Sequence, residues 1–334
     1  MRVVRPWAVT AAVLLGAGCA PEPMIEEAVR TALGDLVAEV DQAELMSVTT
    51  DLVNGHSSDE PFPCEPGDPE KYPRFCALTR TGGEALITAK LEGLGFRVTR
   101  QEMVAHGLPT TNLIADLPGT SRPDEVVLVG AHFDAFYAGA DDNSSGVAAL
   151  LELARVLSRH RFERTIRFVG FDLEELGLIG SARYVQATRG ERLSAVVIFD
   201  CIGYYDARPG SQLSLPGLPT PAAGNFLAVI GNDLSSGQAS ELFRLNQALA
   251  LMEVVPLISP RDGVFTLGGD LMRSDHAPFW LSQEKALFLT DTANFRNPNY
   301  HSPKDTLETL NPDLFHKAVQ VAAAGIAYWA GGPK

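Results

Sequence analysis

The chain has 334 residues, and 46% of them are hydrophobic, so it can bury a large core as one large α/β domain or two smaller ones. Its formal net charge is −14 at pH 7, and its Lys and Arg residues form no basic stripe. Because a nucleic-acid surface needs clustered positive charge, we expect no nucleic-acid partner.

The first 19 residues have the pattern of a signal peptide. Arg2 and Arg5 precede an apolar run over residues 7–17, which is too short to span a bilayer as a helix, and a small-residue processing site follows. The stretch LLGAGC resembles a bacterial lipoprotein signal, which implies that Cys19 is lipidated, although Gly16 stands where a branched apolar residue is more usual. Ordinary signal cleavage nearby is the alternative. We expect export, with the protein either secreted or anchored by lipid to a bacterial membrane facing the periplasm or the exterior.

Residues 20–80 are expected to form an N-terminal segment that packs on a catalytic domain spanning residues 81–334. Helical spacing covers residues 24–55, with acidic side chains on one face. An irregular loop rich in Pro and Gly follows over residues 56–76. The sequence contains no internal repeat that would indicate a further module.

Three cysteines lie beyond the signal region. In an oxidising compartment, Cys64 and Cys76 could form a disulfide that stiffens the Pro-rich loop containing both of them. Cys201 lies next to an apolar run and is expected to be a buried free thiol.

From Gly83 onward, helical and strand-like patterns alternate along the chain. Continuous apolar strands that alternate with helices are typical of a mostly parallel sheet covered on both faces. Asn143 or Ser144 can cap the start of the second expected helix. The expected strands are residues 96–104, 112–117, 125–130, 165–171, 194–199 and 286–290, and the expected helices are residues 84–95, 146–157 and 239–252.

Acidic side chains and histidines follow the expected strands at the points where the strands end. Any one such group is usually a solvated loop, because acids are commonly exposed. In open α/β sheets, however, ligands bind beyond the carboxyl ends of the strands, so the joint placement of these residues indicates a site. The residues that follow the strands are His132, Asp134, Asp172, Glu174, Glu175, Asp200 and Asp291, with His301 ten residues after the last.

The crowding of acids in the stretch VVLVGAHFDAFYAGADDNSSG needs a compensating charge. Buried carboxylates that lie close together repel each other, and a bound cation removes that cost. Two histidines and several carboxylates form the nitrogen and oxygen ligand set that zinc favours, with cobalt or manganese as substitutes. A carboxylate that bridges two ions about 3.5–4 Å apart is a known hydrolytic arrangement.

Six motifs in order, GAHFD, GADDNSSG, FDLEELGLIGS, FDCIGY, SDHAPF and YHSPKDT, resemble the co-catalytic di-zinc aminopeptidase family, which includes bacterial leucyl aminopeptidases and aminopeptidase Y. The resemblance covers roughly residues 112–310. It implies a three-layer αβα fold with a central, mostly parallel but mixed, twisted sheet. It also implies an enzyme that hydrolyses the N-terminal residue of peptides with a free amino terminus, and the signal pattern adds the expectation that this enzyme is exported.

The resemblance also implies a role for each matching residue. His132 and Asp200 would hold one Zn²⁺, Glu175 and His301 would hold the other, and Asp142 would bridge both. Glu174 would be the general base, and Asp134 would orient His132 through a hydrogen bond.

Several assignments stay open at this point. Spacing cannot distinguish Asp142 from Asp141 as the bridge, and Glu174 and Glu175 could exchange roles. Some family members place an oxyanion-binding tyrosine near the SDH segment, but residues 269–276 read GDLMRSDH and contain none. Arg273 or Ser274 could replace it, or could stabilise the loop, and Asp275 and His276 are expected to support the site or the fold. Phe226, Phe265 and Leu267 could line the substrate pocket, or could belong to the core.

Two other functions compete with a zinc aminopeptidase. A glutaminyl cyclase resembles this family but uses one zinc ion, whereas the five predicted ligands here favour two. A lipid-anchored binding protein without activity is the other alternative. Retention of Glu174 beside a complete ligand set argues against it, because loss of catalysis removes the need to hold buried like charges together.

Overall fold

A computed structural model describes residues 25–61, 77–105, 108–214, 220–264 and 269–334. Eight of its strands form one sheet in the order β2-β3-β6-β4-β7-β10-β8-β9. In this described sheet, the pairs β4/β6, β4/β7, β7/β10 and β8/β9 are parallel, and the pairs β2/β3, β3/β6 and β8/β10 are antiparallel. The prediction of a mixed, mostly parallel sheet is therefore confirmed.

The expected strands and helices form, with boundaries that shift by a few residues. The strands of the sheet are β2 (Thr99–Ala105), β3 (Leu108–Leu117), β4 (Arg122–His132), β6 (Arg164–Phe171), β7 (Arg192–Phe199), β8 (Leu227–Asn232), β9 (Val254–Ser259) and β10 (Leu287–Thr290), and a separate short pair joins β1 (Leu78–Thr79) to β5 (Ala135–Phe136). The helices are α1 (Glu27–Val37), α2 (Gln42–Ser58), α3 (Thr81–Gly93), α4 (Gly146–Leu157), α5 (Ile179–Ala187), α6 (Ser236–Leu249), α7 (Ala277–Leu281) and α8 (Pro312–Trp329).

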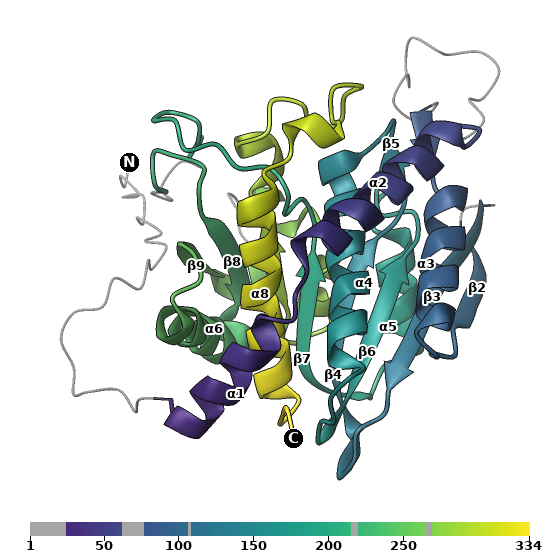
Figure 1. Cartoon of the computed structure of the whole chain (residues 1–334). Helices are drawn as coiled ribbons and strands as arrows, with labels where there is room; N and C mark the ends of the chain where they lie inside the picture. The colour runs from purple at the N-terminus through teal and green to yellow at the C-terminus, as the bar shows by residue number, and fades with distance from the viewer. Residues whose placement is uncertain (1–24, 62–76, 106–107, 215–219, 265–268) are drawn as a thin grey trace, which may run out of the picture.

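Helices cover both faces of the sheet, because the central strands are apolar on both sides (Figure 1). Along β4, Val127 and Val129 point into the core formed with α1, α2, α3, α4, α6 and α8. Val126 and Leu128 point to the opposite face, where α5 and α7 pack. This alternation is the two-residue period of a strand, and it produces the three layers of the αβα fold.

The N-terminal helices α1 and α2 pack on this scaffold and belong to its main core. Asp41 caps α2, since its side chain accepts hydrogen bonds from the backbone N–H groups of Ala43 and Glu44. The backbone N–H of Asp41 donates to Glu152 on α4 at 2.6 Å, which fixes the start of α2 against the helix that follows the predicted site.

Several predictions concern residues outside the described part of the chain. These are the signal peptide with Cys19, the Cys64–Cys76 disulfide, and the pocket residues Phe265 and Leu267. Cys201 is described, and it is free and buried, as expected. Among the helices in the described ranges, none is long and apolar enough to cross a membrane.

Gly130, in the middle of β4, is required by the packing of the α5 and α7 face. A Cβ at this position would lie 2.5 Å from Cε2 of Phe171 and 2.9 Å from Cδ1 of Ile198. Gly130→Ala should therefore lower the free energy of unfolding by about 1–3 kcal/mol in urea denaturation. Gly237→Ala in α6 is the matched control, because its Cβ would contact nothing within 4 Å and its effect should be neutral or stabilising. Equal stabilities for the two variants would contradict this account of the core.

Candidate metal centre

The parallel strands β4, β6 and β7 bring the predicted site residues to one edge of the sheet. His132 is the last residue of β4, Glu174 and Glu175 follow β6, and Asp200 follows β7. Asp142 lies in the tight turn Ala140–Ser145 that leads into α4, and His301 lies in the loop after β10. Residues that are up to 169 positions apart in the sequence thus meet because the carboxyl ends of parallel strands share an edge.

The six predicted ligand and base residues form two adjoining clusters. In each cluster, one candidate ligand atom per residue lies within 4.8 Å of the others. The first cluster contains His132, Glu174 and Asp200, and the second contains Asp142, Glu175 and His301. A third group of the same kind, Asp142, Asp200 and Cys201, joins the two clusters.

Asp142 lies between the two histidines, and its two carboxylate oxygens point to different ones. Oδ1 lies 3.4 Å from Nε2 of His132, and Oδ2 lies 2.8 Å from Nε2 of His301. A carboxylate divided in this way can contribute one oxygen to each of two metal ions. The geometry thus supplies the distinction between Asp142 and Asp141 that residue spacing cannot.

Asp141 has a different function in the same turn. Its Oδ1 accepts a hydrogen bond from the backbone N–H of Gly203 at 2.9 Å, and its Oδ2 accepts one from Asn297 at 2.8 Å. Both oxygens are therefore occupied by the chain. Burial, opposed by these hydrogen bonds, raises the pKa of Asp141 to about 6. The side chain fixes the turn and leaves Asp142 to face the histidines.

The donor set fits zinc. Nε2 of His132 and Nε2 of His301 are buried and make no hydrogen bond with any described residue, although carboxylate oxygens lie 2.8–3.6 Å away. Four ligands at about 2.0–2.2 Å in tetrahedral geometry lie about 3.4 Å from each other. The separations around His132, 3.4 and 3.6 Å, match this value, and those around His301, 2.8 and 3.0 Å, are shorter. Nitrogen lone pairs and carboxylate oxygens that converge without hydrogen bonding are the arrangement expected around a cation.

Asp134 connects the end of β4 to the two glutamates. Its Oδ1 accepts a hydrogen bond from the backbone N–H of Glu174 at 3.0 Å, and its Oδ2 accepts one from that of Glu175 at 3.1 Å. Nδ1 of His132 lies 3.0 Å from the carbonyl oxygen of Asp134 and 3.5 Å from its Oδ1. One buried residue thus orients both the histidine and the glutamate pair.

Burial is the main influence on the pKa of both glutamates. It raises the pKa of Glu174 well above its ordinary value, and the charges of Asp200 and Glu175 raise it further, against the effect of His132. It also raises the pKa of Glu175 to about 8, together with the charge of Asp142. For His301, the effect of burial is outweighed by contacts with Asp142 and Glu175, so that its pKa rises to about 10. Without a metal, the centre therefore retains protons that a cation would displace.

Two acids that follow strands at the same edge do not join the clusters. Asp172 accepts hydrogen bonds from Arg80 at 2.6 Å and from the backbone N–H of Thr111 at 2.8 Å. Asp291 accepts from the backbone N–H groups of Tyr204 and Ala293, at 2.8 Å each. Asp172 thus connects the end of β6 to β3 and Arg80, and Asp291 fixes the loops that contain Tyr204 and Ala293.

Sequence reasoning missed Asp305, which shapes the turn Ala140–Ser145. Asp305 accepts hydrogen bonds from the backbone N–H groups of Asp141 and Asp142 at 3.0 and 3.1 Å. The only signal for it in the sequence was the acid in YHSPKDT. Asn143, one of the two caps that the sequence offered, donates to the carbonyl oxygen of Phe199 at 3.0 Å and accepts from the N–H of Gly146 at 3.1 Å, so it caps α4 and connects the turn to β7.

Sequence reasoning also missed Tyr300, which lies beside the second cluster. Its ring stacks on that of His301, with centroids 3.8 Å apart and an interplanar angle of 15°. Its hydroxyl accepts a hydrogen bond from Arg273 at 3.2 Å, and Arg273 also donates to Asn294 at 2.8 Å. Burial and the charge of Asp142 raise the pKa of Tyr300, so the phenol keeps its proton. A phenol therefore lies beside the second cluster, on a different loop from residues 269–276.

The SDH segment lies beneath the site and is fully buried at Ser274, Asp275 and His276. Nε2 of His276 lies 2.8 Å from the carbonyl oxygen of Leu271, and its ring stacks on Phe288 at 4.4 Å. Burial raises the pKa of Asp275 to about 7. None of these three residues belongs to either cluster.

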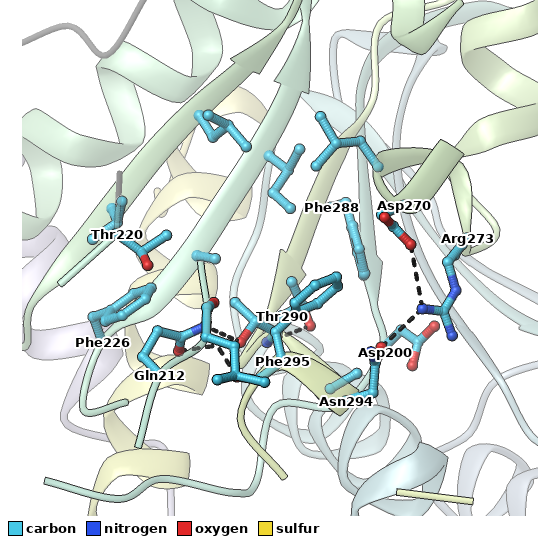
Figure 2. Close-up of a pocket in the computed structure, with 18 of the residues that line it drawn as sticks. Asp200, Gln212, Thr220, Phe226, Asp270, Arg273, Phe288, Thr290, Asn294 and Phe295 are labelled. Atoms are coloured by element: carbon cyan, nitrogen blue, oxygen red, sulfur yellow. Dashed lines mark hydrogen bonds and ion pairs between the residues drawn. The ribbon is translucent and has the colours of Figure 1, made fainter. Parts of the chain in front are cut away.

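A pocket opens beside the metal centre, and Asp200, Arg273 and Tyr300 lie along its wall. Figure 2 shows Arg273, Asp270 and Asn294 near Asp200 at one end, with Phe226 and Thr220 at the other. Phe226, a candidate pocket residue in the sequence, does line this pocket, although its side chain is buried.

Comparison with known proteins assigns the chain to a family. The model of peptidase family M28 matches residues 112–326. The chain belongs to peptidase family M28. This membership confirms the resemblance identified from the six motifs.

One relative is the uncharacterized protein YfbL of Escherichia coli, which is 34% identical to this chain. The alignment covers 68% of this chain and 72% of YfbL. The aminopeptidase YwaD of Bacillus subtilis is 29% identical over 75% of this chain, which spans half the length of YwaD. Together with the family match, the aminopeptidase YwaD confirms the predicted enzyme class, a metallo-aminopeptidase hydrolase. Another relative, named a probable zinc metalloprotease of Pyrenophora tritici-repentis, is 32% identical over 33% of this chain and 28% of its own length, and it supports zinc as the metal.

Solved structures share the fold of this M28 chain. The LapA aminopeptidase of Legionella pneumophila superposes with a TM-score of 0.67 at 21% identity, covering 96% of this chain and 79% of LapA. BSAP, a zinc aminopeptidase from Bacillus subtilis, gives a TM-score of 0.53 at 23% identity, covering 68% of this chain and 52% of BSAP. At these identities, the likeness confirms the αβα architecture.

His276 makes the stability of the protein sensitive to acid. Burial lowers its pKa to about 4, from 6.5, so the unfolded chain binds a proton that the folded chain excludes. The contribution of His276 is intact above pH 6.5 and is lost as the pH falls toward 4, by about 2 kcal/mol at pH 5. Urea denaturation between pH 7 and 5 should therefore show a shallower pH dependence in His276→Gln than in the wild type. Parallel profiles for the two proteins would contradict the assignment of a buried neutral imidazole.

Proposed function

We propose that the protein is an aminopeptidase that uses two zinc ions to remove the N-terminal residue of peptides. His132 and Asp200 would hold one ion, and Glu175 and His301 would hold the other. Asp142 would bridge the two ions. The observation that carries this proposal is the division of the Asp142 carboxylate between two buried histidines that make no hydrogen bond with any described residue.

When bound, the ions would lower the pKa of a water molecule at the site and polarise the carbonyl group of the substrate. The remaining groups of the reaction belong to the chain. Glu174 adjoins His132 and Asp200, makes no ion pair with a described Lys or Arg, and has a raised pKa, so it is suited to accept the proton of the attacking water. It would then return that proton to the leaving amine.

Tyr300 is the best-placed donor for the carbonyl oxygen of the substrate. Arg273 donates to its hydroxyl oxygen, which leaves the phenolic proton free for another acceptor. Stacking on His301 holds the ring beside the metal centre, and the hydroxyl lies at the pocket. A rigid donor aimed at a developing negative charge stabilises the transition state more than the ground state.

The requirement for a free amino terminus follows from what an acylated substrate lacks. Carboxylate oxygens of Asp200 and Glu174 lie within 4.8 Å of each other and can accept hydrogen bonds from the amine of the substrate. A neutral amine also offers a lone pair to a bound metal ion, whereas an acylated amine offers none.

A glutaminyl cyclase is the second candidate, because the glutaminyl cyclase of Porphyromonas gingivalis shares the fold with a TM-score of 0.59 at 18% identity. That likeness concerns the fold alone. The presence of both clusters favours the aminopeptidase, since a one-metal enzyme needs the ligands of only one of them.

Export completes the proposal. The basic residues, the short apolar run and Cys19 in the first 19 residues support a signal peptide and a lipid anchor. Replacement of Cys19 by alanine tests the anchor through the membrane-bound fraction of the expressed protein.

The aminopeptidase activity is tested with pairs of substrates that differ only at the amino terminus. Leucyl-p-nitroanilide should be hydrolysed, N-acetyl-leucyl-p-nitroanilide should not, and a chelator should abolish the activity until zinc is restored. Equal cleavage of both anilides would contradict the requirement for a free amine. Cyclisation of an N-terminal glutamine without hydrolysis of any anilide would favour the cyclase instead.

Glu174→Gln tests the general base. The amide cannot accept the proton of the water, so kcat should fall about 10²–10⁴-fold, while the zinc content stays at the wild-type value. Glu92→Gln, at an exposed position of α3, is the control and should leave both quantities unchanged. Near-normal turnover in Glu174→Gln would show that another group is the general base.

Tyr300→Phe tests the carbonyl donor. Loss of one preorganised hydrogen bond should lower kcat about 10²–10³-fold with a smaller effect on KM, and the zinc content should not change. Tyr328→Phe removes a hydroxyl from a residue that is 41% exposed on α8, and it should leave kcat unchanged. The assignment of Tyr300 as the carbonyl donor would be wrong if the two variants turned over the substrate equally fast.

A further inference from the structure

The pocket beside the metal centre continues across the sheet far beyond the centre itself. It begins at Asp200 and Tyr300, and its floor then crosses three neighbouring strands. Phe288 on β10, Ala228 and Ile230 on β8, and Val255 and Leu257 on β9 form that floor.

One face of the sheet is the side on which α5 and α7 pack. The floor is the half of this face that these two helices do not cover. The helices pack around Phe171, whose ring contacts Tyr184 of α5 at 5.7 Å and Phe279 of α7 at 6.4 Å, on the side of β6. Toward the other edge of the sheet, Val255 and Leu257 remain only half-buried. An apolar strand surface of this kind gains free energy when an apolar group covers it.

The length of this floor exceeds that of an ordinary apolar side chain. The strand order β7-β10-β8-β9 contains three strand spacings of about 4.8 Å, so the floor extends about 14 Å from the strand that carries Asp200. A leucine side chain is three C–C bonds long and reaches about 4 Å from its Cα. A leucine at the amino terminus of a substrate would therefore not reach the half-buried end of the floor on β9, which lies beyond the buried residues Phe288, Ala228 and Ile230.

Charge is confined to the end of the pocket next to the metal centre. Asp200, Asp270 and Arg273 are the charged residues that line it within the described ranges, and they lie close together in Figure 2. Arg273 lies 3.8 Å from Asp270. The floor on β8 and β9 offers no partner for a charged side chain, so an acidic or basic group would lose its hydration there without compensation.

We propose that this pocket selects substrates whose N-terminal residue carries a long, unbranched apolar side chain, with Leu257 and Ile230 at the end of the floor as specificity-determining residues. The inference rests on the proposed aminopeptidase function, which places the N-terminal side chain in the pocket. The pocket is continuous with Asp200 and Tyr300, and this continuity identifies the occupant as the substrate itself.

The test is a chain-length series of 2-aminoalkanoyl-p-nitroanilides with acyl chains of four, six, eight and ten carbons. Burial of one methylene contributes about 0.8 kcal/mol, so kcat/KM should rise about fourfold per added carbon through the eight-carbon substrate and should not fall at ten. A maximum at six carbons, followed by a decline, would overturn the proposal.

Leu257→Phe shortens the floor at its far end and provides a second test. It should lower kcat/KM for the ten-carbon substrate at least tenfold more than for the leucyl substrate. Val104→Phe is the matched control: Val104 is 71% exposed on β2, at the opposite edge of the sheet, and its replacement should preserve the wild-type length profile. A parallel loss on short and long substrates in Leu257→Phe would contradict the assignment of the floor.

The two proposals fail in different ways. If the protein hydrolyses leucyl-p-nitroanilide but gains nothing from longer chains, the inference about the pocket is wrong and the aminopeptidase function stands. If no 2-aminoalkanoyl anilide is hydrolysed by the zinc-loaded protein, the proposed function itself is wrong.

Discussion

The main constraint on the structure is the repulsion among buried carboxylates at one edge of the sheet, which a positive charge has to offset. Four acids lie together around two histidines: Asp142, Glu174, Glu175 and Asp200. Burial and the neighbouring charges raise the pKa of Glu174 and of Glu175. The ion-pair partners of Asp142, Asp200 and Glu175 in the described ranges are the two histidines. A pair of divalent cations would offset the remaining negative charge, which is why we propose a metal centre supported by the surrounding hydrogen bonds.

Those hydrogen bonds fix the side chains before any metal binds. Asp134 holds both glutamates by their backbone N–H groups, and Asp305 does the same for Asp141 and Asp142. Such preorganisation matters because a metal bound to fixed ligands does not have to order them. The sheet contributes in the same way, since parallel strands bring His132, Glu174 and Asp200 to one edge through buried, rigid elements.

The sequence allowed the scaffold and the metal-facing side chains to be predicted, because both follow periodic or local rules. Apolar runs gave the strands β4, β6 and β7, and the residue after each run gave His132, Asp172 with Glu174, and Asp200. Tyr300 and Asp305 could not be found this way. Their function depends on the path of the loop after β10, which brings Tyr300 to Arg273 and Asp305 to the turn at Asp142. The pocket floor was missed for a similar reason, since β8 follows an irregular segment, and the pairing of β8 with β10 and with β9 is not a local property of the sequence.

The central claim is that two metal ions lie on either side of the Asp142 carboxylate. Anomalous X-ray diffraction at the zinc absorption edge, on crystals of the purified protein, tests it directly. The account predicts two peaks about 3.5–4 Å apart, one beside His132 and Asp200 and the other beside Glu175 and His301. A single peak at full occupancy in crystals grown with excess zinc would contradict it.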